Sequence, residues 1–223
     1  MIGIIPYASQ KVICNVKEAL RYMGYSNKNL KVADDTLMSS VYECKDELEN
    51  ILNPKACYSE VEINVKDDCV TGEFGCFKSK ALAKNLKGCT KAVLFCATIG
   101  IQTDLIIKKY SVTSPSKSVI CDALASSAVE VWCDAVEREV SCGRGTRPRF
   151  SAGYGDFDIS YQKVISQFLN TSKNCGVTVT NSMMMIPTKS VTAIAGIDDN
   201  LKCKSYNNKC LRCTNKHCEY RND

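Results

Sequence analysis

The sequence contains little that would suit a membrane, secreted or nucleic-acid-binding protein. The best candidate for a membrane span, Ala92 to Ile101, ends after ten residues, whereas a spanning helix needs about 18 or more apolar residues. The N-terminal MIGIIPYASQK has no charged start, no long apolar stretch and no cleavage site, so we expect no secretion signal. The net charge of +5 is too mild to argue for binding of nucleic acid, which would call for a concentrated basic patch. We therefore expect a cytoplasmic protein with no membrane and no nucleic-acid partner.

Histidine is almost absent, and no low-complexity stretch or proline- or glycine-rich linker precedes residue 198. The one histidine, His217, lies near the C-terminus, which leaves little scope for histidine acid–base chemistry. Hydrophobic residues make up 45% of the 223 residues and charged residues 24%, which is enough to bury a core unaided. The composition therefore excludes a disordered or fibrous chain and favours one main domain.

Cysteine is the residue in excess, with 15 in the chain. The odd number, the chain length and the missing export signal favour reduced thiols over a disulfide framework. Cys44, Cys96 and Cys133 lie in apolar patterns where small core residues are expected, and a free cysteine behaves as one. Only the last four cysteines, near the C-terminus, depart from this pattern.

Three segments have apolar residues every three or four positions, which predicts amphipathic helices. They run from Asn15 to Tyr25, from Asp34 or Asp35 to Asn53, and from Ser116 to Ser141. Shorter helices are expected at Ser79 to Lys87, after a capping Thr103, and after a cap near Asp158.

Strands are predicted where apolar and polar residues alternate, or where a short apolar run is bounded by turns. These segments are Cys57 to Lys66, Val70 to Phe74, Lys91 to Thr98, Val177 to Met184 and Ser190 to Ile197. Because helices and strands do not alternate regularly, we expect an α+β fold with a mostly antiparallel, twisted sheet flanked by helices. This domain spans residues 1–200, and a short cysteine-rich C-terminal tail follows at 201–223.

The loop from Arg144 to Asp156 is the segment most suggestive of function, because a loop this long in a compact domain usually serves a function. Arg149 carries a fork of donors that suits a carboxylate. Gly153 permits a positive φ and a close approach of backbone to ligand. Tyr154 stands between two glycines, so its ring is expected to project outward. The loop predicts a ligand site; the alternative is a flexible connection in which Arg149 caps a helix end.

The same loop carries a family resemblance. The run Arg149-Phe-Ser-Ala-Gly-Tyr154-Gly resembles the Arg-x-x-x-Gly-Tyr signature of the activation domain of cobalamin-dependent methionine synthase, and it is still more similar to the stand-alone proteins related to that domain. Four other segments resemble family counterparts in matching order: EALRYMGY at 18–25, LFCATIG at 94–100, DALASSAVE at 122–130 and SMMMIPTKSVTAIAGI at 182–197. The resemblance covers roughly residues 10–200.

The resemblance implies that the chain binds S-adenosylmethionine as a methyl donor and supports the reductive methylation that reactivates an oxidised corrinoid. Arg149 would hold the methionine carboxylate, and Tyr154 would face the corrinoid. Glu130 matches a glutamate near the cationic end of the ligand; the alternative is a solvated charge on the helix surface. The backbone groups implied on the adenosine side are those of Ser151, Ala152 and Gly153.

The sequence also departs from the family pattern. The family's N-terminal aspartate ligand, and an acidic ligand just before the arginine, have no counterpart, and Arg144 and Arg147 stand in that neighbourhood instead. No homocysteine, folate or cobalamin module is present. The resemblance therefore implies a cobalamin carried by a separate partner, a methionine synthase or another corrinoid protein, with an electron donor such as flavodoxin or ferredoxin. The chain would present the methyl donor and needs no acid, base or nucleophile of its own.

The tail gathers four thiols into a short polar segment. Cys203, Cys210, Cys213 and Cys218 include one Cys-x2-Cys pair, a spacing typical of metal clips. Four soft ligands suit zinc or an iron–sulfur cluster, and the spacing does not separate the two. The alternative is a disordered tail that is merely rich in cysteine.

Three hypotheses for function follow from the sequence. The first is an S-adenosylmethionine-binding partner that supports reactivation of a separate cobalamin-dependent methionine synthase or related methyltransferase. The second is an electron-transfer protein whose tail cluster reduces a corrinoid partner. The third is a structural binding module that has lost the ligand site, which the missing acidic ligands permit.

Overall fold

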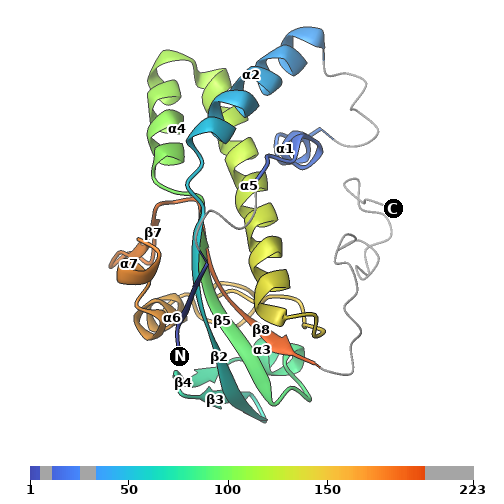
Figure 1. Ribbon diagram of the computed structural model, residues 1–223, viewed down its shortest axis with the longest axis vertical. Coiled ribbons are helices and arrows are strands. Elements are labelled where there is room, and N and C mark those ends of the chain that lie inside the picture. Colours follow the sequence, from blue (N-terminus) through green and yellow to red (C-terminus); the bar gives the residue numbers. More distant parts are fainter. Residues whose placement is uncertain (6–11, 26–33, 199–223) are drawn as a thin grey trace.

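A computed structural model describes residues 1–5, 12–25 and 34–198, and its framework is a twisted antiparallel sheet (Figure 1). The strands are β1 (Gly3–Ile5), β2 (Lys55–Lys66), β3 (Cys69–Gly72), β4 (Gly75–Lys78), β5 (Lys91–Thr98) and β8 (Ser190–Ile197). Their order is β4-β3-β2-β5-β8, and β1 pairs with the first part of β2. A separate two-stranded sheet joins β6 (Thr178–Val179) to β7 (Met185–Ile186). The predicted α+β fold with an antiparallel sheet is confirmed.

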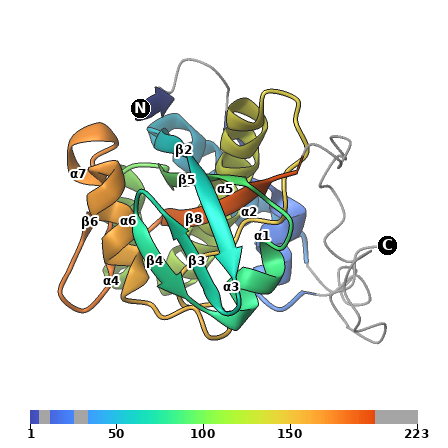
Figure 2. The same cartoon turned by 90° about the horizontal axis from the view of Figure 1, so that it is seen from below.

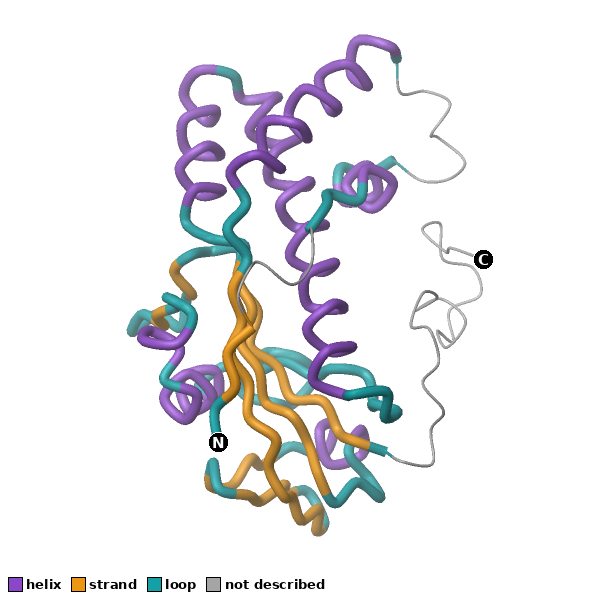
Figure 3. The backbone as a smooth tube through the Cα atoms, viewed as in Figure 1, coloured by secondary structure: helices purple, strands orange, loops and turns teal. Residues whose placement is uncertain are grey.

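Helices cover both faces of this sheet (Figure 2). They are α1 (Val16–Tyr22), α2 (Asp35–Ile51), α3 (Lys80–Asn85), α4 (Gln102–Thr113), α5 (Pro115–Ser141), α6 (Tyr161–Leu169) and α7 (Thr171–Asn174). One face, here called the α5 face, packs against α1, α2 and α5. The opposite face, the α6 face, packs against α3 and α6. Figure 3 shows that α5 extends beyond the strands, where its first half meets α2 and α4.

Strand β5 divides its apolar side chains between two cores, because successive side chains of a strand point to opposite faces. Phe95 and Ala97 belong to the core of the α5 face, whereas Leu94 and Cys96 belong to the core of the α6 face. On the α5 face the indole of Trp132 is buried. Its Nε1–H donates to the backbone oxygen of a β2 residue, Lys55, over 3.0 Å. This bond ties α5 to the start of β2, which is an inner strand of the sheet.

Side-chain caps and a left-handed residue define the ends of the predicted helices. The Asn15 side chain accepts a hydrogen bond from the Glu18 N–H at the start of α1, and Asp34 accepts one from Leu37 at the start of α2. Such side chains satisfy N–H groups that have no partner within the first turn. Helix α5 ends where Cys142 adopts a left-handed conformation, with φ of 49°, before Gly143.

Three local predictions need correction. Thr103 does not cap α4: it lies within the first turn, and its buried hydroxyl donates to the Gly100 oxygen over 2.8 Å. The strand predicted at 70–74 is present as β3 but ends at Gly72, where a turn leads into β4; Gly75, at the start of β4, has φ of 100°. The predicted strand at 177–184 keeps only β6, because a turn closed by Thr180 N–H and the Met184 oxygen follows it, with φ of 61° at Met183.

In the described ranges, none of the helices is long and apolar enough to cross a membrane. The cysteines at 14 to 175 are free thiols, and most of them are buried in the two cores. Their burial agrees with the interpretation of these cysteines as small core residues.

Candidate functional site

The loop between α5 and α6, residues 142–160, lies along the outer edge of β8. The Arg147 N–H donates to the Gly196 oxygen over 2.8 Å. Phe150 and Ile194 exchange two backbone hydrogen bonds of 2.8 and 2.9 Å. Because β8 ends the strand order of the main sheet, these bonds satisfy backbone groups at an otherwise open edge. The first half of the loop is therefore built onto the sheet.

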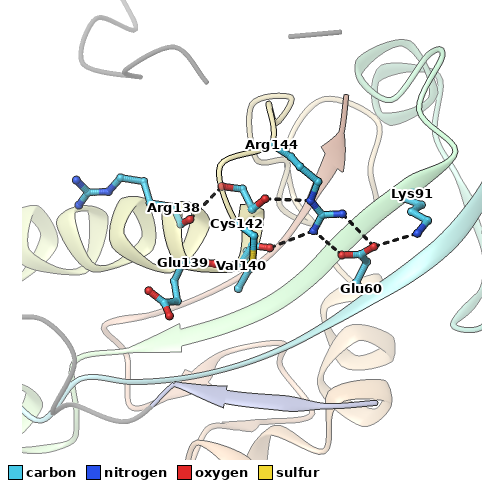
Figure 4. A network of polar contacts seen from close by, with 8 residues as sticks. Glu60, Lys91, Arg138, Glu139, Val140, Cys142 and Arg144 are labelled. Carbon is cyan, nitrogen blue, oxygen red and sulfur yellow. Dashed lines mark hydrogen bonds and ion pairs between the residues drawn. The ribbon is translucent and has the colours of Figure 1, made fainter. Parts of the chain in front are cut away.

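Where the loop leaves α5, Arg144 joins the helix end to β2 (Figure 4). Its guanidinium donates to the backbone oxygens of Ser141 over 3.0 Å and Val140 over 3.4 Å, at the negative end of the helix dipole. The same guanidinium binds Glu60 of β2, with Nη2 2.6 Å from Oε2. Lys91 of β5 also contacts Glu60, at 3.3 Å. The hydrogen bond from Arg144 and the charge of Lys91 hold the pKa of Glu60 below its ordinary value.

Arg147 fixes the next part of the loop. Its Nη2 lies 2.8 Å from Oδ2 of Asp198, just after β8, and 3.5 Å from the Lys87 oxygen after α3. Arg144 and Arg147, the residues found where the family resemblance leads one to expect an acidic ligand, are thus engaged in ion pairs that hold the loop on the sheet.

The second half of the loop is tied down by Asp156. Its carboxylate accepts hydrogen bonds from the Ser79 hydroxyl over 2.6 Å, and from the N–H groups of Lys80 and Ala81 over 2.8 and 3.0 Å. These donors belong to the start of α3, so Asp156 caps that helix from a distant part of the sequence. The hydrogen bond from Ser79, followed by those from Ala81 and Lys80, lowers the pKa of Asp156 to about 2.

Arg149 lies between these anchors and contacts α5. Its Nη2 is 2.5 Å from Glu130, and its Nη1 is 2.5 Å from both Asp134 and Glu137. The three acids are spaced i, i+4 and i+7, so they share one face of the helix. The side chains of Arg149 and Glu137 are 13% and 8% exposed, whereas those of Glu130 and Asp134 are 33% and 45% exposed. The cluster therefore has a buried end at Glu137 and an open end at Glu130 and Asp134.

In this Arg149 cluster one guanidinium is shared by three carboxylates. Burial by itself would lower the pKa of Arg149, but Cys133 and the carboxylates of Glu137 and Glu130 outweigh burial and raise it. Arginine thus stays charged here, as its high ordinary pKa already favours. At the open end, the partly exposed carboxylates of Glu130 and Asp134 are groups that a cationic ligand could contact.

The structure brings together two of the residues that the sequence singled out, Arg149 and Glu130. The residues after Arg149 form a tight turn, in which Tyr154 N–H donates to the Ser151 oxygen over 3.2 Å and Gly153 N–H to the Phe157 oxygen over 2.7 Å. Gly153 has φ of 95°, the left-handed conformation expected of it. Ala152 is buried in the core of the α6 face, and the Tyr154 side chain is exposed, as the flanking glycines predicted.

Sequence reasoning missed Asp134 and Glu137, which complete the Arg149 cluster. The signal for them was present, because Glu130, Asp134 and Glu137 recur at the spacing of one helix face. The same spacing is typical of a solvated helix surface, so it gains meaning only once Arg149 is known to lie against it.

The predicted metal ligands Cys203, Cys210, Cys213 and Cys218 lie outside the described residues, as does the whole of the tail at 201–223. Within the described part of the chain, no group of three or more histidine, cysteine, aspartate or glutamate side chains is arranged to hold a metal ion. The zinc or iron–sulfur clip stays a prediction.

Comparison with known proteins gives a likeness of fold. No family model matches the sequence, and no curated protein matches it. Among solved structures, the fold is similar to the crystal structure of the MetH reactivation domain bound to AdoHcy, with a TM-score of 0.68. The match covers 92% of this chain and 81% of that chain at 14% sequence identity. At this identity the likeness establishes the fold alone, and the neighbour is a domain of the kind that the sequence resembles.

Proposed function

We propose that the protein binds S-adenosylmethionine between the Arg149 loop and α5 and presents its methyl group to the corrinoid of a separate methyltransferase. The single observation that carries the proposal is the Arg149 cluster, in which the family's arginine position meets an acidic face of the long helix. It is supported by the shared fold with a MetH reactivation domain bound to AdoHcy, the demethylated form of the proposed ligand.

The residues of the cluster suit the chemistry of this ligand. S-adenosylmethionine carries a carboxylate, an ammonium group and a sulfonium, so it needs one cationic and two anionic contacts. Arg149 offers a planar fork for the carboxylate. Glu130 and Asp134, at the open end of the cluster, offer negative charge to the cationic groups. Backbone groups of Ser151, Ala152 and Gly153 are proposed for the adenosine side.

Binding would require Arg149 to change partners. In the structure its guanidinium is shared among three carboxylates. The partly exposed Glu130 and Asp134 can move toward solvent or toward the ligand, whereas the buried Glu137 would stay on Nη1 and keep the guanidinium in place. The ligand carboxylate would then replace Glu130 at Nη2.

The proposal includes a partner in the cytoplasm that carries cobalamin, either a cobalamin-dependent methionine synthase or another corrinoid protein. Tyr154 is exposed beside the Arg149 loop and is the residue proposed to face the corrinoid. The ligand supplies the methyl group, and an electron donor such as flavodoxin or ferredoxin supplies the electron. The chain itself binds the ligand and orients it.

Calorimetry with S-adenosylmethionine tests the binding step. Arg149→Lys keeps the positive charge but loses the fork, so we expect affinity to fall about tenfold or more, since a charged hydrogen bond contributes about 1.5–3 kcal/mol. Arg138→Lys is the matched control, because Arg138 is an exposed residue of α5 that contacts a backbone oxygen of its own helix. Absent binding by the unaltered protein, or equal affinity of the Arg149→Lys variant, contradicts the proposal.

A reactivation assay tests the remaining steps. The protein, S-adenosylmethionine and a reductant are added to a cobalamin-dependent methionine synthase in its oxidised, inactive form. We expect methionine synthesis to return, and we expect Tyr154→Ala to reduce that return while leaving ligand affinity unchanged. Return of activity without the protein would remove its proposed role.

The Arg149 cluster also favours a second candidate function, a structural binding module that has lost the ligand site. In that case the three carboxylates of α5 replace the ligand as permanent partners of Arg149. The calorimetry above separates the two, because only the first proposal expects heat of binding. The electron-transfer alternative depends on the tail and is tested by the visible absorption of the purified protein.

A further inference from the structure

A second chemical cluster, made only of thiols, lies in the core of the α6 face. Cys57 of β2 and Cys96 of β5 are direct partners in the antiparallel register. Cys175 follows α7 and contacts both, with its Sγ 3.5 Å from the Sγ of Cys57. All three thiols are buried. The proposed ligand-binding function uses none of them.

Cys175 is the central thiol of this cluster. Hydrogen bonds from Cys57 and Cys96 favour its thiolate and lower the pKa of Cys175. The same contacts, together with burial, raise the pKa of Cys57 and of Cys96. Cys57 and Cys96 are held in strands, whereas Cys175 lies in a turn. Cys175 is therefore the thiol of the three best able to move toward an oxidant, and its thiolate would be the reactive form.

We propose that Cys57 and Cys175 form a reversible disulfide when the protein meets hydrogen peroxide. The Cys175 thiolate attacks one peroxide oxygen, which gives a sulfenic acid and, after protonation of the leaving hydroxide, one water. The sulfur of Cys57 then attacks the sulfenic sulfur, its proton leaves with the hydroxyl group, and a second water forms. Two thiols are thus oxidised by two electrons while one peroxide is reduced to two waters. A small dithiol reverses the bond by exchange.

The surroundings of the cluster favour this product. A thiolate buried among apolar side chains is costly, whereas a disulfide is uncharged. The two sulfur atoms must close from 3.5 Å to about 2 Å. Cys57 is held within a central strand, but Cys175 lies in a turn and precedes Gly176, whose φ is 74°. The turn can therefore supply the movement while the sheet stays in place.

Another pair of touching thiols provides an internal comparison. Cys44 of α2 and Cys121 of α5 are neighbours on the α5 face, and burial raises the pKa of both. Both belong to long helices, and neither has the lowered pKa of Cys175. We expect this pair to stay reduced under conditions that oxidise Cys57 and Cys175.

The test is a disulfide map of the full chain. Reduced protein is treated with hydrogen peroxide, unfolded, alkylated, digested and examined by mass spectrometry. We expect a peptide that joins Cys57 to Cys175, lighter by two hydrogens than its reduced parts and released by dithiothreitol. A link between Cys44 and Cys121 without the link between Cys57 and Cys175 overturns the proposal. So does full alkylation of Cys57 and Cys175, which would mean that both stayed reduced, in a sample where the exposed Cys76 is already oxidised.

Variants add a second readout. Peroxide should raise the melting temperature of the unaltered protein, because the bond joins residues 118 positions apart and restricts the unfolded chain. Cys175→Ala should abolish this rise. Cys133→Ala, which removes a buried thiol on the α5 face, should retain it. An equal rise in the Cys175→Ala variant overturns the proposal, and the map of the unaltered protein decides the question if a variant fails to fold.

Discussion

Arg144 and Arg149 belong to the same loop, but their surroundings have opposite charge. At Arg144 two cations, Arg144 and Lys91, share the single carboxylate of Glu60. At Arg149 one cation is shared by three carboxylates of α5. Arg144 also binds the backbone at the end of α5, whereas the Arg149 guanidinium contacts carboxylates of that helix.

The difference separates a clamp from a candidate ligand site. The contacts of Arg144 are those needed to hold a helix end on a strand, and each has a structural purpose. At Arg149, three carboxylates of one helix face are held together at a single guanidinium, and like charges held together cost stability. An arrangement that costs stability and faces solvent at one end is typical of a functional site.

The largest expected effect is that of Arg149→Ala. This change removes the guanidinium that contacts the buried carboxylate of Glu137 and the partly exposed carboxylates of Glu130 and Asp134. Breaking a buried pair in this way costs about 3 kcal/mol or more. We expect urea unfolding to show a loss of that size in the free energy of unfolding.

Glu137→Gln in the Arg149→Ala background provides the control. The second change removes the buried charge of the Glu137 carboxylate, which no longer contacts Arg149. It should therefore recover part of the lost stability. If the double variant is less stable than Arg149→Ala alone, charge does not hold the Arg149 cluster together. The comparison with Arg144, which rests on charge, would then fail.

A smaller effect is expected for Glu60→Gln. Both Glu60 and Arg144 are about one third exposed, so solvent screens the pair. We expect urea unfolding to show a loss of about 1 kcal/mol, and no change in affinity for S-adenosylmethionine. A loss as large as that of Arg149→Ala, or weaker ligand binding, would show that the two clusters do not differ as described.

The smallest effect is expected at Asp156, where the loop is tied to α3, and it depends on pH. The pKa of Asp156 is about 2, below the ordinary value of 3.8. A carboxylate whose pKa is lowered by folding stabilises the fold fully at pH values above its pKa in the unfolded chain. This contribution to stability disappears as the pH falls from about 3.8 to about 2. The difference in stability between the unaltered protein and Asp156→Asn should therefore be constant above pH 5 and shrink below pH 4. A difference that grows as the pH falls would contradict the assignment.

Much of the fold followed from the sequence because local rules decided it. The alternation from Cys57 to Lys66 identified β2, and Asn15 and Asp34 were positioned to cap helices. The strand predicted at 70–74 ends two residues early, at Gly72, because the chain turns there to pair β3 with β4.

The candidate site was predicted only in part. The composition of the loop and the family resemblance identified Arg149, and the resemblance added Glu130. The contacts of Arg149 with Asp134 and Glu137 depend on the path of the loop across α5. That path cannot be predicted from a local sequence pattern. The clamps formed by Arg144 and Asp156 join residues far apart in the chain, so they also required the fold.

The pairing of the loop with β8 has a consequence for how the site opens. Loops that bind ligands usually exchange their amide hydrogens quickly, because they open without disturbing the rest of the fold. Here the amides of Arg147 and Phe150 donate to β8, as a strand would. They should exchange as slowly as the amide of Ile194, so a ligand would enter through rearrangement of side chains while the backbone beneath them stays closed.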